Sequence, residues 1–179
     1  MNISTAANYA EIAGGFAVLV SLIYVGYQIR QSNRIASASA LQSVLDRFSD
    51  RNISQYLEHP EIEQVMHRGH QCFNDLTILE GELFSACILR EVFHMQNVMQ
   101  LHKRGLLDTV DYETWLAYTA AHIKTPGGQE TWKRLKVSIT PTIVKTIEAF
   151  LEANPSSPSL IELYPHAYQA HVAPEASVE

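Results

Sequence analysis

The sequence predicts an all-α protein: an amino-terminal transmembrane helix, a juxtamembrane helix that continues from it, and a small cytoplasmic helical bundle. Three observations predict this fold. Residues 12–27 contain no charged side chain, and Arg30 and Arg34 follow at once. Residues 31–57 contain neither proline nor glycine, so one helix can pass through them. The rest of the chain has apolar residues at three- and four-residue steps, separated by helix-capping residues.

The apolar run begins with IAGGFAVLVSLIYVGY and continues to Ile29, so it extends over about 18 residues, or about 27 Å of helix. A hydrocarbon core is about 30 Å thick, so the flanking side chains must cover the difference. Tyr24 and Tyr27 are suited to the headgroup level, and Arg30 and Arg34 can extend toward it. We therefore expect these four residues to anchor the helix at the membrane interface.

The charges on the two sides of the run predict its orientation. The residues before Glu11 include no lysine or arginine, whereas Arg30 and Arg34 follow the run. Basic residues favour the cytoplasmic side of a membrane. We therefore expect a bacterial inner (plasma) membrane protein with its amino end outside and its main domain in the cytoplasm.

Three other interpretations of the run are weighed against a spanning helix. A cleaved signal peptide would have a basic region before the apolar core, and residues 1–9 have none. A buried core helix of a soluble protein is compatible with so short a run. A helix lying in the interface would need one strongly polar face, which residues 12–27 do not have.

Small residues recur every fourth position within the run, at Ala13, Ala17 and Ser21. On a helix this spacing forms a flat stripe that lets a second helix approach closely, although small residues also face lipid in many spanning helices. The stripe favours a homo-oligomer or an association with other membrane-protein subunits.

Composition limits the function classes. The chain has 19 acidic and 13 basic residues, for a net charge of −6, and has no basic stripe. This balance argues against nucleic-acid binding. Cys72 and Cys87 are expected to be free thiols in a reducing compartment.

The remaining elements follow from capping residues and breakers. We expect the first helix to run from Tyr9 to Leu57. After the membrane run its predicted apolar stripe consists of Ile35, Ala38, Leu41, Leu45, Phe48 and Asn52. The expected later elements are a helix from Pro60 to Gly69, one from Thr77 to Arg104 that Gly105 ends, one capped by Asp108 or Thr109 to Ile123, a turn at residues 125–128, a short helix around residues 132–137, and one from Thr140 to Asn154.

These elements divide the chain into three parts. Residues 1–30 form the transmembrane anchor and residues 31–154 the helical cytoplasmic domain. Residues 155–179 are rich in proline, serine and alanine and have no apolar period. We expect them to be an extended tail that, where ordered, lies on another surface.

Several residue runs carry a family resemblance. They are EIAGG from Glu11, SLIYV from Ser21 and QIRQ from Gln28, followed by RGLLD from Arg104 and TPGG from Thr125. In this order they resemble a family of uncharacterised bacterial single-pass membrane-anchored helical proteins. The resemblance implies an amino-terminal anchor and a small helical domain. It implies no known activity and so no catalytic residues.

Two clusters of polar residues are candidates for a metal or catalytic site. Glu91 and His94 lie one helical turn apart, but a di-iron site would need a second such motif and two further glutamates. His67, His70 and Cys72 lie close in sequence without a second ligand pair for zinc. A buried polar pair and a helix end with exposed histidines are the expected interpretations. The sequence therefore indicates no catalytic, metal or cofactor-binding residue.

The leading hypothesis is a non-enzymatic membrane-anchored assembly protein, either self-oligomerising or an accessory subunit of a larger membrane complex. The alternative is a membrane-tethered enzyme or ligand sensor with a pocket in the bundle, using Glu91 and His94. A regulator that reads the state of the bilayer through the long helix is a third possibility, and the sequence does not separate it from the first.

Overall fold

A computed structural model describes residues 3–49 and 58–169, and the side chains of residues 11–46 and 58–168. This part of the chain is helical and contains no strand, which confirms the predicted all-α class. Its elements are α1 Ile3–Ser49, α3 Pro60–Gln71, the 3₁₀ turn η2 Phe73–Asp75, α4 Ile78–Lys103, α5 Thr109–Ile123, α6 Pro126–Leu135, the 3₁₀ turn η3 Lys136–Ser138, α7 Pro141–Ala153, α8 Leu160–Leu163 and α9 Pro165–Gln169.

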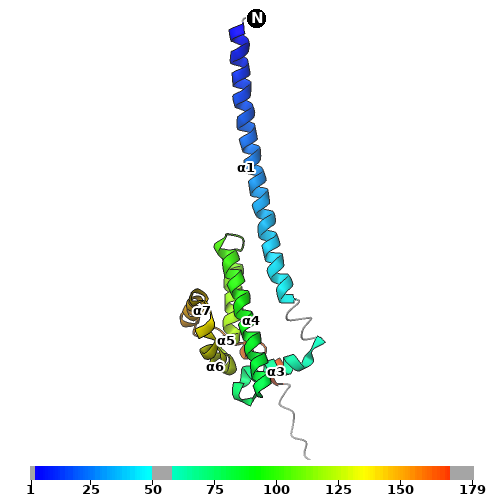
Figure 1. Ribbon diagram of the computed structural model, residues 1–179, viewed down its shortest axis with the longest axis vertical. Coiled ribbons are helices and arrows are strands. Elements are labelled where there is room, and N and C mark those ends of the chain that lie inside the picture. Colours follow the sequence, from blue (N-terminus) through cyan, green and yellow to red (C-terminus); the bar gives the residue numbers. More distant parts are fainter. Residues whose placement is uncertain (1–2, 50–57, 170–179) are drawn as a thin grey trace, which may run out of the picture.

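Helix α1 is continuous over 47 residues and projects from the bundle (Figure 1). At 1.5 Å per residue it is about 70 Å long. Every described side chain from residue 11 to residue 36 is exposed. Among the described residues, α1 is the helix long and apolar enough to span a membrane. One helix therefore joins the predicted spanning segment to the described part of the juxtamembrane segment without a break, and the predicted end at Leu57 lies outside the described residues.

The bundle is built around α4, which packs against α3, α5 and α6, while α7 packs on α5. Two apolar clusters fill it. The smaller one joins α3 to the first half of α4 and is centred on Phe84. The larger one joins the second half of α4 to α1, α5, α6 and α7. Its buried members are Val44, Val92, Met95, Val98, Met99, Leu107, Leu116, Ile123, Trp132, Ile139, Ile143 and Ile147.

The ends of α4 follow the predicted capping signals. The hydroxyl of Thr77 accepts from the backbone N–H of Glu80, and the Glu80 carboxylate accepts from the backbone N–H of Thr77. Gly105 follows the helix with φ of 69°, a conformation that a residue with a Cβ adopts only at a cost. Asp108 then caps α5 by accepting from the N–H of Asp111. These three local predictions are confirmed.

The predicted turn at residues 125–128 is wrong, because these residues begin α6. Thr125 is the N-cap, its hydroxyl accepts from the N–H of Gly128 at 3.1 Å, and Pro126 occupies the first turn. A proline at this position costs no helical hydrogen bond. The two glycines therefore belong to a helix. A Cβ at Gly128 would lie 2.1 Å from the carbonyl oxygen of His122 in α5, and the crowding at Gly127 comes from α3.

Helices α3 and α6 approach each other backbone to backbone. A Cβ added at Gly127 would lie 1.7 Å from the carbonyl oxygen of Gly69. A Cβ added at Gly69 would lie 2.4 Å from the ring of Phe84. Both positions therefore require glycine for the observed spacing of the helices.

The face of α1 that contacts the bundle differs from the predicted stripe. Ala40 and Val44 are buried, whereas Ile35 and Leu45 of the predicted stripe are 63% and 45% exposed. The contact face follows Ser37, Ala40, Leu41 and Val44 at three- and four-residue steps. The helix is rotated by about one residue, or about 100°, from the sequence-based expectation.

The exposure of α4 also corrects one prediction. The sequence has apolar residues on most sides of this helix, among them Leu79, Phe84, Val92 and Phe93, which predicts a helix that is apolar around most of its circumference. Leu79 and Phe93 are instead 77% and 53% exposed. The helix is central to the bundle, but one face of it remains in contact with solvent.

The segment predicted to be an extended tail contains two short helices, α8 and α9, in its described part. Ser159 and Glu162 form a capping box that starts α8, a local signal not recognised in the sequence. Leu160 and Tyr168 are buried against Ala121 of α5. As expected for an ordered tail, the segment lies on another surface and does not build its own core; residues 170–179 lie outside the described residues.

The lysine at the end of α5 holds the start of this segment. The Nζ atom of Lys124 donates to the carbonyl oxygens of Asn154 at 3.3 Å and Pro155 at 2.8 Å, and to that of Ser157. These oxygens follow the end of α7, where helix carbonyls lack intrahelical partners. The lysine thus fixes the chain where it leaves α7 and turns back onto α5.

Replacing Gly127 by alanine is expected to destabilise the bundle by about 2 kcal/mol or more, because α3 and α6 must separate to admit the methyl group. Urea unfolding followed by circular dichroism measures this loss. Gly26→Ala is the matched control, since a Cβ at that helical position meets nothing within 4 Å. Equal stability of Gly127→Ala and the wild type would contradict the close approach of the two helices.

Candidate functional site

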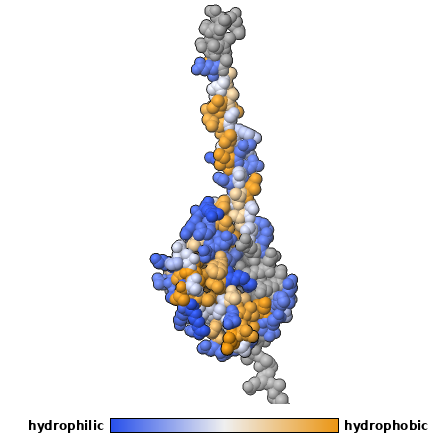
Figure 2. Space-filling view, viewed as in Figure 1, coloured by the Kyte–Doolittle hydropathy of each residue, from blue (hydrophilic) through white to orange (hydrophobic). Residues whose placement is uncertain are grey.

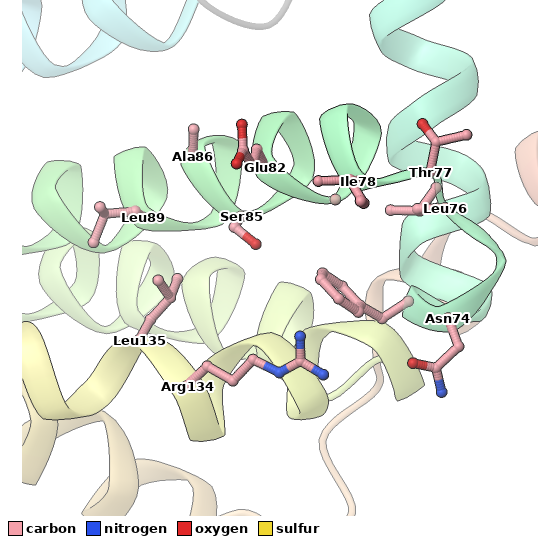
Figure 3. Close-up of a pocket in the computed structure, with 12 residues that line it drawn as sticks. Asn74, Leu76, Thr77, Ile78, Glu82, Ser85, Ala86, Leu89, Arg134 and Leu135 are labelled. Atoms are coloured by element: carbon pink, nitrogen blue, oxygen red, sulfur yellow. The ribbon is translucent and has the colours of Figure 1, made fainter.

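A groove of about 630 Å³ lies between the first half of α4, the turn at η2 and the end of α6 (Figure 3). Its volume is within the range of small-molecule sites. Its lining residues are Phe73, Asn74, Leu76, Thr77, Ile78, Gly81, Glu82, Ser85, Ala86, Leu89, Arg134 and Leu135. The groove is the candidate site because an apolar surface and a few polar groups meet there.

One wall of the groove carries a fixed cation. The guanidinium carbon of Arg134 lies 4.6 Å from the centroid of the Phe73 ring, and Arg134 Nη2 lies 2.8 Å from Glu130 Oε1. The ring and the carboxylate both favour the guanidinium in this position. Lys133 Nζ is 3.9 Å from the other oxygen of Glu130, so one carboxylate serves two cations. Lys133 does not line the groove, so Arg134 is the cation that this wall presents to it.

The opposite wall is the exposed face of α4. Gly81 is buried, and a Cβ there would lie 3.3 Å from Phe73, so the lack of a side chain keeps the groove open near this ring. Ser85 points into the groove, whereas the carboxylate of Glu82 lies on the side of α4 away from Arg134 (Figure 3). The polar lining thus consists of the Arg134 cation, the Asn74 amide, the hydroxyls of Thr77 and Ser85 and the Glu82 carboxylate, and the rest of the surface is mainly apolar.

A second group of polar residues is buried between α3, α5 and α6. His70 and His122 are 1% and 4% exposed, and Thr125 is fully buried. His122 Nδ1 lies 3.3 Å from His70 Nε2, and His70 Nδ1 lies 3.2 Å from Thr125 Oγ1. No local pattern in the sequence indicates that His70 would meet His122 and Thr125, which lie 52 and 55 positions further along the chain.

The hydrogen bonds assign the protons in this group. Thr125 Oγ1 donates to the carbonyl oxygen of His122 at 2.8 Å and accepts from the N–H of Gly128 at 3.1 Å. It must therefore accept from Nδ1–H of His70, which leaves His70 Nε2 to accept from Nδ1–H of His122. Both imidazoles are neutral in this arrangement, and a proton added to His70 Nε2 would break its bond to His122.

The electrostatic environment also favours the neutral form of His70. Burial lowers the pKa of His70 well below its usual range, and the neighbouring His122 and His67 lower it further. The rings of Phe84 and Tyr168 also lie beside His70 at centroid distances of 5.0 and 6.1 Å. These contacts join α3 to α4 and α9, so the neutral histidine is part of the packed bundle.

The prediction of exposed histidines at the end of α3 is therefore wrong for His70. His67 is half-buried, its ring is 4.8 Å from that of Tyr168, and Cys72 is a half-buried free thiol. Among the described residues, no group of three or more histidine, cysteine, aspartate or glutamate side chains is arranged to hold a metal ion.

Glu91 and His94 are both buried on α4, as expected for a polar pair within the bundle. The ring of His94 lies 5.1 Å from that of Trp115 in an edge-on arrangement. Neither residue lines the groove. The alternative hypothesis of a pocket that uses these two residues is not supported by this geometry.

The predicted packing stripe lies along the exposed half of α1. Ala13, Ala17 and Ser21 occupy successive turns of one helix, and Ser21 Oγ donates to the carbonyl oxygen of Ala17 at 2.8 Å. This bond satisfies the hydroxyl within its own helix, so the stripe presents no unpaired polar group. Their proposed role as a packing face stays a prediction.

The predicted interface anchors follow along the same helix. Tyr24 and Tyr27 are 60% and 65% exposed, and Arg30 and Arg34 are also exposed. All four side chains are thus accessible to whatever surrounds α1. Their contact with a membrane interface stays a prediction.

No family model, curated protein or solved structure matches the chain. The family resemblance drawn from the residue runs therefore stays a prediction.

The free energy of unfolding is expected to fall as the pH falls below about 6.5, the ordinary pKa of histidine. Because the folded protein keeps His70 neutral, the unfolded chain binds more protons in this range. Each extra proton lowers the stability by up to about 1.4 kcal/mol per pH unit. Urea unfolding at pH 7.5, 6.5 and 5.5 measures this slope.

His70→Asn retains a donor close to the position of Nδ1 and removes the titrating group, so we expect a smaller slope. His166→Gln is the matched control, because it removes an exposed imidazole. A slope in His70→Asn as large as that of the wild type would contradict the role of His70.

Proposed function

We propose that this chain is a non-enzymatic, single-span membrane anchor that holds its helical bundle at the cytoplasmic surface of a bacterial inner membrane and assembles with copies of itself. The observation that carries the proposal is the continuity of α1. Its apolar half is exposed along its whole described length, and its other half is packed into the bundle through Ala40 and Val44. Because the helix is continuous, the position of its apolar half determines the position of the half that contacts the bundle.

The exposed apolar half supports the membrane part of the proposal. Phe16, Leu22 and Ile23 are 67%, 65% and 67% exposed. In water, each such side chain would forgo about 1.5–3 kcal/mol of stabilisation relative to an apolar environment. A bilayer supplies this environment along the whole segment. Arg30 and Arg34 after it favour a cytoplasmic bundle.

The small-residue stripe supports self-assembly. Membrane helices associate through close packing, because lipid already satisfies their apolar side chains. Ala13, Ala17 and Ser21 leave room for a second backbone, and the internal hydrogen bond of Ser21 removes a polar obstacle. Copies of the chain that meet through this stripe would bring their bundles together at the membrane surface.

Ala17→Leu is expected to weaken self-association by on the order of 1 kcal/mol, because the larger side chain separates the two helices. Cross-linking and native mass spectrometry of the chain in mild detergent measure the oligomer distribution. Leu19→Ala is the matched control, since residue 19 is rotated by about 200° from residue 17 on the helix. A monomeric wild type, or an unchanged distribution in Ala17→Leu, would contradict the proposal.

A further inference from the structure

We infer that the groove between α4 and α6 is a binding site for a single-chain amphiphile that has an anionic head, a carboxylate or a phosphate, and one hydrocarbon chain. The anionic head would lie beside Arg134, and the hydrocarbon chain would lie between the two helices toward Leu89 and Leu135. This inference does not depend on self-association of α1.

The apolar surface of the groove fits a hydrocarbon chain. Along α4 the lining runs from Ile78 to Leu89, about 16 Å at 1.5 Å per residue. Figure 3 shows Leu89 and Leu135 facing each other across one end of the groove. Ile78, at the other end, is 83% exposed. A chain laid along this surface would remove these side chains from water, which favours binding in proportion to the area covered.

The position of Arg134 fits an anionic head. The Phe73 ring and Glu130 hold its guanidinium at the edge of the groove, so little side-chain freedom remains to be lost on binding. A guanidinium has five N–H groups, and the bond to Glu130 uses Nη2. Other N–H groups can therefore donate to a carboxylate or phosphate. The amide of Asn74 lies at the same side of the groove (Figure 3).

The location of the groove indicates that its ligand arrives from water. The turn after α4 lies beside Ser37 and Leu41 of α1, on the side of the apolar half. The groove is at the opposite end of α4, and the helix is about 39 Å long. Figure 1 shows this end of the bundle far from the amino terminus. A monomeric amphiphile, and not a lipid of the surrounding bilayer, is therefore the expected occupant.

Isothermal titration calorimetry tests the inference with the full chain in nanodiscs and empty nanodiscs as the blank. The probes are octanoate, octyl phosphate, octylammonium and octanol. We expect both anions to bind at least about tenfold more tightly than octylammonium. Whichever anion binds more tightly identifies the head as carboxylate or phosphate. Heats for octanoate and for octyl phosphate that both equal those of the empty nanodiscs would overturn the inference.

Two variants test separately the contact with the anionic head and the contact with the hydrocarbon chain of the ligand. Arg134→Gln should weaken octanoate about tenfold or more and leave octanol unchanged, while Lys145→Gln, which removes an exposed cation elsewhere, should change neither. Ser85→Leu fills the groove from α4 and should abolish the binding of all the probes. Thermal unfolding checks that each variant is folded, and Arg134 is on the surface, so its removal leaves the core intact.

Two further results would overturn the inference. Octanoate affinity in folded Arg134→Gln equal to that of the wild type would mean that the cation does not hold the head. A change of oligomeric state in Ser85→Leu, with no binding of octanoate to the wild type, would mean that the groove is covered by a second copy of the chain.

Discussion

The apolar side chains of α1 cannot be covered by the rest of the described chain, and this constraint governs the whole molecule. The helix is straight and continuous, so its first half extends beyond the reach of the bundle (Figure 2). A contiguous apolar surface of this size on a soluble protein would be an interaction or aggregation site. The proposed burial in hydrocarbon would remove this problem and would leave the bundle at one defined end of the helix.

The bundle contacts that end of the helix through a few side chains. Val44 is fully buried in the larger apolar cluster with residues of α4, α5 and α7, Leu41 packs against this cluster, and Ala40 is buried. The turn at Gly105 lies beside the same part of α1. If α1 spans a bilayer as proposed, these contacts place the groove at the end of the bundle away from the membrane.

Local signals in the sequence predicted most of the helices. The capping box at Thr77, the cap at Asp108 and the glycine at position 105 act within one helical turn, so they can be read without knowledge of the fold. The errors have a common cause. Gly127 was assigned to a turn because its requirement for glycine comes from Gly69, which is distant in sequence. The contact face of α1 was also predicted wrongly, because the local sequence does not show which side of the helix the bundle contacts.

The candidate sites are also formed by residues that are distant in sequence, so local patterns do not reveal them. His70 was expected to be exposed because its partners, His122 and Thr125, are more than fifty residues away. The groove joins two segments that are also about fifty residues apart, and neither has a motif of its own. By contrast, the residues of the predicted membrane segment are contiguous, and their charge pattern is visible in the sequence alone.

Nitroxide accessibility along α1 tests most directly whether hydrocarbon surrounds its apolar half. Labels at Val20, Gln31 and Val44, in a chain whose two cysteines are replaced, would be measured in nanodiscs with oxygen and a water-soluble nickel complex. If hydrocarbon surrounds this half of the helix, relaxation by oxygen will exceed relaxation by nickel at residue 20, and relaxation by nickel will be the stronger at residue 31. Neither reagent will relax a label at residue 44. Strong relaxation by nickel at residue 20, or a label there that neither reagent reaches, would contradict it.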